Sequence, residues 1–236
     1  PRPDDFQIKE AAEKIKLSKN PIIISGGGVF YSDAMSELSD FAIKHNIPVT
    51  QTVMGYSTMK RDHSHYAGAL GGLGGKNANY LAKKTDLAIA VGTKLADFTT
   101  GSWANFENEK FKLVSINVSR FDANKHLAQA VVGDAKVSLK ELSIALGDWK
   151  VGDDWNKKSQ QELELWNENV EKESAPTNQE IPSYAQVIGA VYRNSDPSDI
   201  AVTAAGGLVG EVLQVWRPRE LNTYETEWGF SCMSYE

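Results

Sequence analysis

Short apolar runs alternate with amphipathic stretches through the first 150 residues, and this alternation limits the possible folds more than any other feature. Pro21–Ser25 and Asp86–Gly92 each contain an unbroken apolar run, as strands buried on both faces of a parallel sheet do. Weaker runs of the same kind are Pro48–Thr52, Leu113–Val118 and Val131–Val132. Between them, apolar residues recur at helical spacing in Ile8–Ile15, Ala34–His45, Asn77–Lys84 and Ala135–Leu146. Residues 1–150 are therefore predicted to form an α/β domain with a doubly wound parallel sheet.

The second part of the chain has a different pattern. Trp155, Leu163, Trp166 and Val170 form a thin apolar stripe among many charges, which predicts one exposed helix, followed by a polar linker over Glu171–Glu180. A new α/β pattern begins at Ile181, with a strand over Ile200–Thr203 and a helix over Leu208–Trp216. Residues 181–236 hold too few strands for a closed sheet, so we expect the truncated start of a second α/β domain, and a chain cut from a longer enzyme.

The charge balance excludes two classes of partner. Acidic residues outnumber basic ones by 31 to 25, for a formal net charge of -6, whereas nucleic-acid binders usually present a basic face. No apolar run approaches the roughly 20 residues that span a bilayer. With a single cysteine, Cys232, the chain can form no internal disulfide. We expect a soluble, cytoplasmic protein that binds neither nucleic acid nor membrane.

Two glycine-rich segments resemble phosphate-binding loops only in part. Gly26-Gly27-Gly28 joins a strand to a helix, but Tyr31 stands where a dinucleotide fingerprint requires glycine, which favours a plain tight turn. Gly68–Lys76 departs from the Walker pattern at Leu70, and again at the residue after Lys76. A ligand site and a domain-packing loop both remain open for this second segment.

The histidines and the cysteine give no strong chemical signal. His63 and His65 lie in a polar segment without the further Cys or His ligands of a metal site, which predicts a solvated loop. No histidine lies near Cys232 in sequence, so an inert thiol is favoured over a nucleophile. Ala205-Gly206-Gly207 is more informative, because glycines between a strand and a helix leave backbone N–H groups free for a phosphate.

Several segments together resemble the thiamine-diphosphate enzymes of the acetohydroxyacid synthase-like superfamily. The central-domain matches are Ile47-Pro48-Val49, the glycine-rich stretch after Asp62-His63, Asp86–Gly92 with Asp97, and Val132–Ala135. A narrower resemblance is to the hydrolases that open the ring of a trihydroxycyclohexane-1,2-dione in inositol breakdown. It is carried by Ser115–Arg120, the Ala-Gly-Gly-Leu run from Ala205, and Gly229–Met233 with Tyr235-Glu236; Ser234 departs from the family, which has glycine there.

The resemblance implies a cofactor site at two places. Ala205, Gly206 and Gly207 would lie by the diphosphate, and Ser231, Cys232 and Met233 by the pyrimidine and thiazolium rings. The glutamate that activates the cofactor is expected before Pro1, and the Gly-Asp-Gly motif and asparagine that bind Mg²⁺ after Glu236. No catalytic or metal-binding residue is therefore assigned within the chain, which we expect to be inactive alone.

Two alternatives stay open beside this hydrolase, whose substrate would be a cyclic polyol-dione and whose full-length form would be a homo-oligomer. One is a carboligase that acts on 2-oxo acids. The other is a nucleotide-binding or FAD-binding regulatory module, since related central domains hold FAD or ADP in some enzymes.

Overall fold

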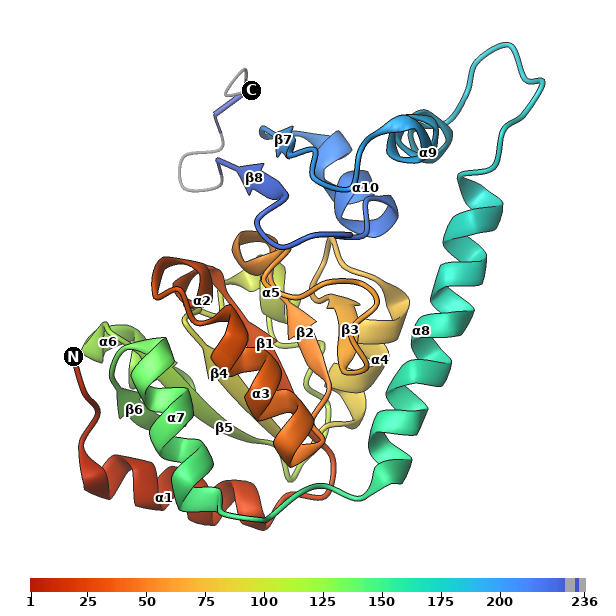
Figure 1. Ribbon diagram of the computed structural model, residues 1–236. Coiled ribbons are helices and arrows are strands. Elements are labelled where there is room, and N and C mark those ends of the chain that lie inside the picture. Colours follow the sequence, from red (N-terminus) through yellow and green to blue (C-terminus); the bar gives the residue numbers. More distant parts are fainter. Residues whose placement is uncertain (228–231, 234–236) are drawn as a thin grey trace.

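The computed structural model describes residues 1–227 and 232–233, and its larger part is built on a six-stranded parallel sheet (Figure 1). The strands are β1 (Pro21–Ser25), β2 (Val49–Gln51), β3 (Tyr66–Ala69), β4 (Leu87–Val91), β5 (Lys112–Asn117) and β6 (Gln129–Val132). They follow the order β3-β2-β1-β4-β5-β6, which is the strand order of doubly wound nucleotide-binding domains. This confirms the predicted α/β class. Every residue of the central strands β1 and β4 is buried, as their continuous apolar runs predicted.

Helices cover both sides of this sheet. The long ones are α1 (Asp5–Lys16), α3 (Met35–His45), α4 (Lys76–Lys84) and α7 (Ala135–Leu146). Helix α7 packs against α1 and α3, while α4 packs beside β3. Local chemistry fixes their ends: the side chains of Asp4 and Asp134 accept hydrogen bonds from backbone N–H groups in the first turns of α1 and α7. Asn46 ends α3 in the left-handed conformation that Asn adopts more readily than most residues.

Short helices occupy the connections between the strands, four of them just after the carboxyl end of a strand and the last just before β6. They are α2 (Gly27–Tyr31), η1 (Val53–Gly55), α5 (Asp97–Thr100), α6 (Arg120–Ala123) and η2 (Lys125–Leu127). The sequence showed no periodicity for these elements, because three to five residues are too few to display one.

Helix α8 (Asp153–Glu173) differs from the exposed helix that was predicted. Its apolar stripe is buried: Trp155, Leu163 and Val170 face the rest of the protein. The indole Nε1–H of Trp155 donates to the carbonyl oxygen of Pro21 at 2.8 Å, and α8 also packs on α4 and β3. The prediction failed because even a thin apolar stripe, of which Trp166 is half-buried, is enough to bury one face of a helix against the edge of a sheet. The linker also starts later than predicted, since α8 continues to Glu173.

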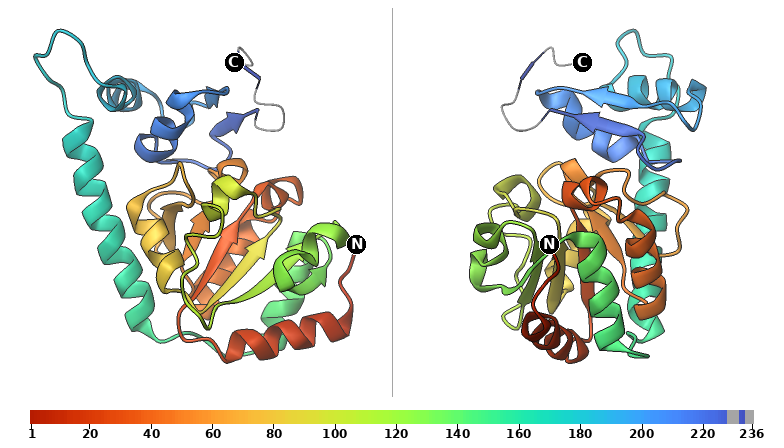
Figure 2. Two further views of the ribbon diagram at one scale, coloured as in Figure 1. Left: turned by 180° about the vertical axis from the view of Figure 1, so that it is seen from behind. Right: turned by 60° about the vertical axis from the view of Figure 1, so that its left-hand side comes forward.

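A small second unit lies above the loops that contain α2 and α5, and α8 connects it to the central domain (Figures 1 and 2). It contains α9 (Tyr184–Asn194), β7 (Ala201–Thr203), α10 (Gly207–Val215) and β8 (Tyr224–Thr226). Strands β7 and β8 pair in parallel as a separate two-stranded sheet. A second apolar cluster joins α9 and α10 to Val53, Tyr56 and Ala69 of the central domain.

Within residues 1–227 and 232–233, no helix combines the length and apolar character needed to cross a membrane.

Candidate functional site

A cleft of about 730 Å³ opens at the carboxyl ends of the central strands. It lies between the loops that follow β1, β4 and β5, next to the point where the strand order reverses from β1 to β4. Open α/β sheets bind their ligands at this position. Large exposed apolar side chains border it, namely those of Tyr31, Met54, Phe98 and Val118. An apolar cleft with a few polar groups is typical of small-molecule sites.

The floor of the cleft depends on two glycines that bring the first and fourth strand ends together. The N–H of Gly28 donates to the carbonyl oxygen of Gly92 at 2.9 Å. A Cβ atom at Gly28 would lie 2.5 Å from the Cα of Gly92, which itself adopts a left-handed φ of +62°. The first glycine segment is therefore a tight turn that packs backbone on backbone, as its departure from the dinucleotide fingerprint predicted.

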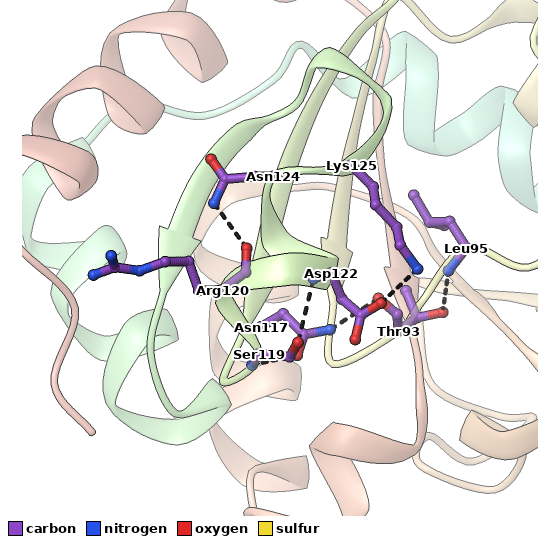
Figure 3. Close-up of polar contacts among 8 residues, drawn as sticks. All are labelled: Thr93, Leu95, Asn117, Ser119, Arg120, Asp122, Asn124 and Lys125. Atoms are coloured by element: carbon purple, nitrogen blue, oxygen red, sulfur yellow. Dashed lines mark hydrogen bonds and ion pairs between the residues drawn. The ribbon is translucent and has the colours of Figure 1, made fainter.

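One wall of the cleft is a chain of polar contacts after β5, shown in Figure 3. The Asn117 amide donates to the carbonyl oxygen of Thr93 at 3.1 Å and accepts from the N–H of Ser119 at 2.9 Å. Ser119 in turn caps α6 by accepting from the N–H of Asp122 at 3.2 Å. The hydrogen bond from Lys125, at 2.7 Å, lowers the pKa of Asp122. This carboxylate is therefore ionised, and the ammonium group of Lys125 balances its charge.

The backbone groups of the second glycine segment, Gly68–Lys76, are hydrogen-bonded to other groups of the protein. Gly71 exchanges two hydrogen bonds with the amide of Asn79, each at 2.9 Å. The N–H groups of Gly74 and Gly75 donate to the carbonyl oxygens of Gly71 and Ala69 in the same segment, and that of Gly72 donates to the carbonyl oxygen of Phe98 in α5. Leu73 lies against α10, where its side chain is 3.1 Å from the position of a Cβ at Gly210. These contacts favour the domain-packing alternative for this segment.

The prediction of a solvated loop around His63 and His65 is wrong for His65. Its ring is buried, with Nε2 3.0 Å from the Oδ1 of Asn46 and Nδ1 2.9 Å from the hydroxyl of Ser64. Burial, with a smaller contribution from the neighbouring His63, lowers the pKa of His65 to about 4. The prediction failed because the residues just before His65 in the sequence are polar, which is typical of an exposed loop. No cluster of three His, Cys, Asp or Glu side chains suited to a metal ion occurs in the described part of the chain.

The predicted diphosphate segment begins α10 without a cap. Gly206 holds the N-cap position with a φ of +134°, and no side chain accepts from the first turn of the helix. Gly206 and Gly207 are exposed, and a Cβ added to either would meet no atom within 4 Å. Free N–H groups and open space at the start of a nine-residue helix fit an anionic group such as a diphosphate.

The predicted ring-binding residues are less well defined. Ser231 lies outside the described residues. Cys232 is a free, exposed thiol whose backbone N–H donates to the Glu227 carboxylate at 2.9 Å. Desolvation and that carboxylate raise the pKa of the Cys232 thiol, which does not favour a nucleophile. Met233 is 78% exposed, and no hydrogen bond among the described residues joins Cys232 or Met233 to Ala205–Gly207.

Sequence reasoning missed the residues of the cleft. Thr93 follows β4, whereas Asn117 and Asp122 lie five residues apart at the end of β5 and in α6, and the sequence assigned no role in a cleft to any of them. Their position could have indicated a cleft, because each lies at or shortly after the carboxyl end of a strand that was predicted correctly.

Curated relatives match the chain over nearly its whole length. Proteins of Clostridium tetani, Clostridium perfringens and Geobacillus thermodenitrificans are 37%, 34% and 34% identical to it, over 99%, 98% and 100% of this chain. All three carry the name 3D-(3,5/4)-trihydroxycyclohexane-1,2-dione hydrolase. The chain spans 40% of the length of each.

The family model described as "Thiamine pyrophosphate enzyme, central domain" matches residues 8–142. These residues run from α1 to α7 and include the whole six-stranded sheet. The chain therefore belongs to the family of thiamine pyrophosphate enzymes, and its six-stranded sheet is that family's central domain.

Proposed function

We propose that the chain is part of a thiamine-diphosphate-dependent hydrolase that opens the ring of a trihydroxycyclohexane-1,2-dione in myo-inositol degradation. The observation that carries this proposal is the match to relatives of that name over both units of the chain, not over the central domain alone. When bound, thiamine diphosphate would supply the carbanion chemistry that cleaves the bond between the two carbonyl carbons of the dione. Water supplies the hydroxyl of the new carboxylic acid, and the cleaved carbon–carbon bond leaves an aldehyde at the other end.

The chain's own contribution would be to bind and orient the cofactor. We propose that Ala205, Gly206 and Gly207 hold the diphosphate at the start of α10, where free N–H groups and open space support this role. Ser231, Cys232 and Met233 would lie beside the two rings. The activating glutamate and the ligands of Mg²⁺ are expected from other parts of the full-length protein, which we propose is a cytoplasmic homo-oligomer.

The test is turnover by the full-length protein. The purified apo-protein is mixed with the trihydroxycyclohexanedione, with and without thiamine diphosphate and Mg²⁺, and the products are followed by NMR. The proposal predicts a ring-opened acid only when both cofactors are present. Consumption of a 2-oxo acid, with no reaction of the dione, would favour the carboligase.

A second candidate function concerns the cleft at the carboxyl ends of β1, β4 and β5. Its position at the point of strand reversal and its apolar rim support the binding of a nucleotide or FAD as a regulatory ligand. Calorimetry with ADP, together with the absorbance spectrum of the purified protein, tests this candidate. A colourless protein that takes up no ADP at millimolar concentration would exclude it.

A further inference from the structure

The two ends of α10 differ in exposure and in hydrogen bonding. The first turn, at Gly206 and Gly207, is exposed and uncapped. The last turn is buried, and its carbonyl oxygens accept hydrogen bonds from other elements. A helix leaves its final carbonyl oxygens without partners inside the helix, so donors from elsewhere fix that end in place.

One set of donors comes from the central domain. The hydroxyl of Tyr56 lies 2.8 Å from the carbonyl oxygen of Trp216 and 3.0 Å from that of Leu213. Tyr56 is 4% exposed, so water does not compete for this hydroxyl. The backbone N–H of Arg61 donates to the carbonyl oxygen of Pro218 at 2.7 Å. The segment just after α10 is thus held by residues that follow β2.

Further contacts that hold this segment come from α8 and α9. Tyr192 donates its hydroxyl to the carbonyl oxygen of Arg217 at 3.0 Å, and Arg61 Nη1 donates to the same Tyr192 hydroxyl at 2.6 Å. The guanidinium of Arg217, 5% exposed, pairs with Glu171 of α8. We call Tyr56, Arg61, Glu171, Tyr192 and Arg217 the clamp.

We propose that the clamp positions the diphosphate-binding start of α10, with Tyr56 and Arg217 as positioning residues. This inference rests on the proposed function. Nine residues at 1.5 Å each make α10 about 13 Å long, so a tilt of about 5° at the clamped end moves its start by about 1 Å. Hydrogen bonds from the N–H groups weaken steeply over that distance. The central domain therefore serves the proposed cofactor site as a support.

The test uses the full-length apo-protein and two isosteric substitutions. Tyr56→Phe removes the hydroxyl from the clamp. Thr85→Val is the matched control, because the hydroxyl of Thr85 is also buried and also lies within hydrogen-bond distance of two carbonyl oxygens, those of Asn20 at 2.7 Å and Leu87 at 2.8 Å. Thr85 lies at the amino end of β4, at the opposite end of the sheet. Thiamine diphosphate is titrated in the presence of Mg²⁺ by tryptophan fluorescence, and deuterium uptake is measured over residues 207–215.

Both substitutions should lower the melting temperature, but only Tyr56→Phe should raise the Kd for thiamine diphosphate, by tenfold or more, and speed deuterium uptake in α10. A Tyr56→Phe protein with wild-type affinity overturns the inference, as does an equal loss of affinity in both variants. If Tyr56→Phe does not fold, Glu171→Gln tests the same clamp from its exposed side and should also weaken binding. A wild-type protein that binds no thiamine diphosphate overturns the proposed function, and the inference with it.

Discussion

Acidification should destabilise the central domain through His65, a buried residue on the loop that leads into β3. The Nδ2 of Asn46 donates to the carbonyl oxygen of Val151 and to Asp153, each at 3.1 Å, so its Oδ1 faces His65 as an acceptor. His65 must then carry its proton on Nε2 and accept from Ser64 at Nδ1. These hydrogen bonds require the neutral imidazole of His65. Through Asn46 they also connect the end of α3 to the start of α8.

The size of the effect follows from the lowered pKa. Burial first, and then the neighbouring His63, lowers the pKa of His65 from 6.5 to about 4. Because the folded state binds fewer protons than the unfolded state, this contribution to stability is complete above pH 6.5. It is lost as the pH falls from 6.5 towards 4. With these two pKa values, the loss at pH 5 is about 2 kcal/mol.

The assay is urea unfolding of the wild type and of His65→Gln at pH 7.5 and pH 5. His65→Gln cannot titrate, so its stability should fall by about 2 kcal/mol less than that of the wild type between the two pH values. Since the pKa values of His45 and His63 are also lowered by burial, both proteins should retain some pH dependence. His126→Gln is the control: desolvation also lowers the pKa of His126, but its side chain is exposed, so it should contribute less than His65. Identical losses in wild type and His65→Gln would refute the reasoning.

Three further outcomes are expected. Gly28→Ala should cost about 3 kcal/mol or more in urea unfolding, because its Cβ would overlap the backbone of Gly92; Gly152→Ala, at a position with open space and a negative φ, should cost about 1 kcal/mol at most. The chain of residues 1–236 alone should bind thiamine diphosphate more weakly than micromolar in calorimetry with Mg²⁺, because the expected metal ligands lie elsewhere; micromolar binding would contradict this. In the full-length enzyme, Met233→Ala should slow proton exchange at the thiazolium C2 with little change in melting temperature, if Met233 is the apolar wedge that holds the cofactor bent. An unchanged exchange rate in the folded, loaded variant would remove that role.

The fold was predictable where apolar runs were long. The strands β1, β4 and β5 and the helices α1, α3 and α7 each extend over enough residues to show a period or a continuous apolar run. Strand β3 was missed because its four residues, Tyr66–Ala69, include a glycine with a positive φ and no β-branched side chain. Strand β8 was missed because its three residues, Tyr224–Thr226, form no apolar run.

Tertiary contacts explain what the sequence could not show about the candidate sites. Nothing near Tyr56 in the sequence indicates that its hydroxyl will meet α10 some 157 residues later. The burial of His65 and the polar wall around Asn117 also arise from elements that are distant along the chain. The start of α10 was different, because a strand, two glycines and a helix follow one another directly, and a local pattern is enough to predict an open helix N-terminus.

The most direct test of the central claim is isotope transfer from water during turnover. The full-length protein, with thiamine diphosphate and Mg²⁺, would convert the trihydroxycyclohexanedione in H₂¹⁸O, and the product would be analysed by mass spectrometry. Hydrolytic ring opening predicts a chain-opened acid with at least one ¹⁸O in its new carboxylate, formed only when the cofactor is present. A ring-opened acid without ¹⁸O in that carboxylate, or the same product without thiamine diphosphate, would contradict the account.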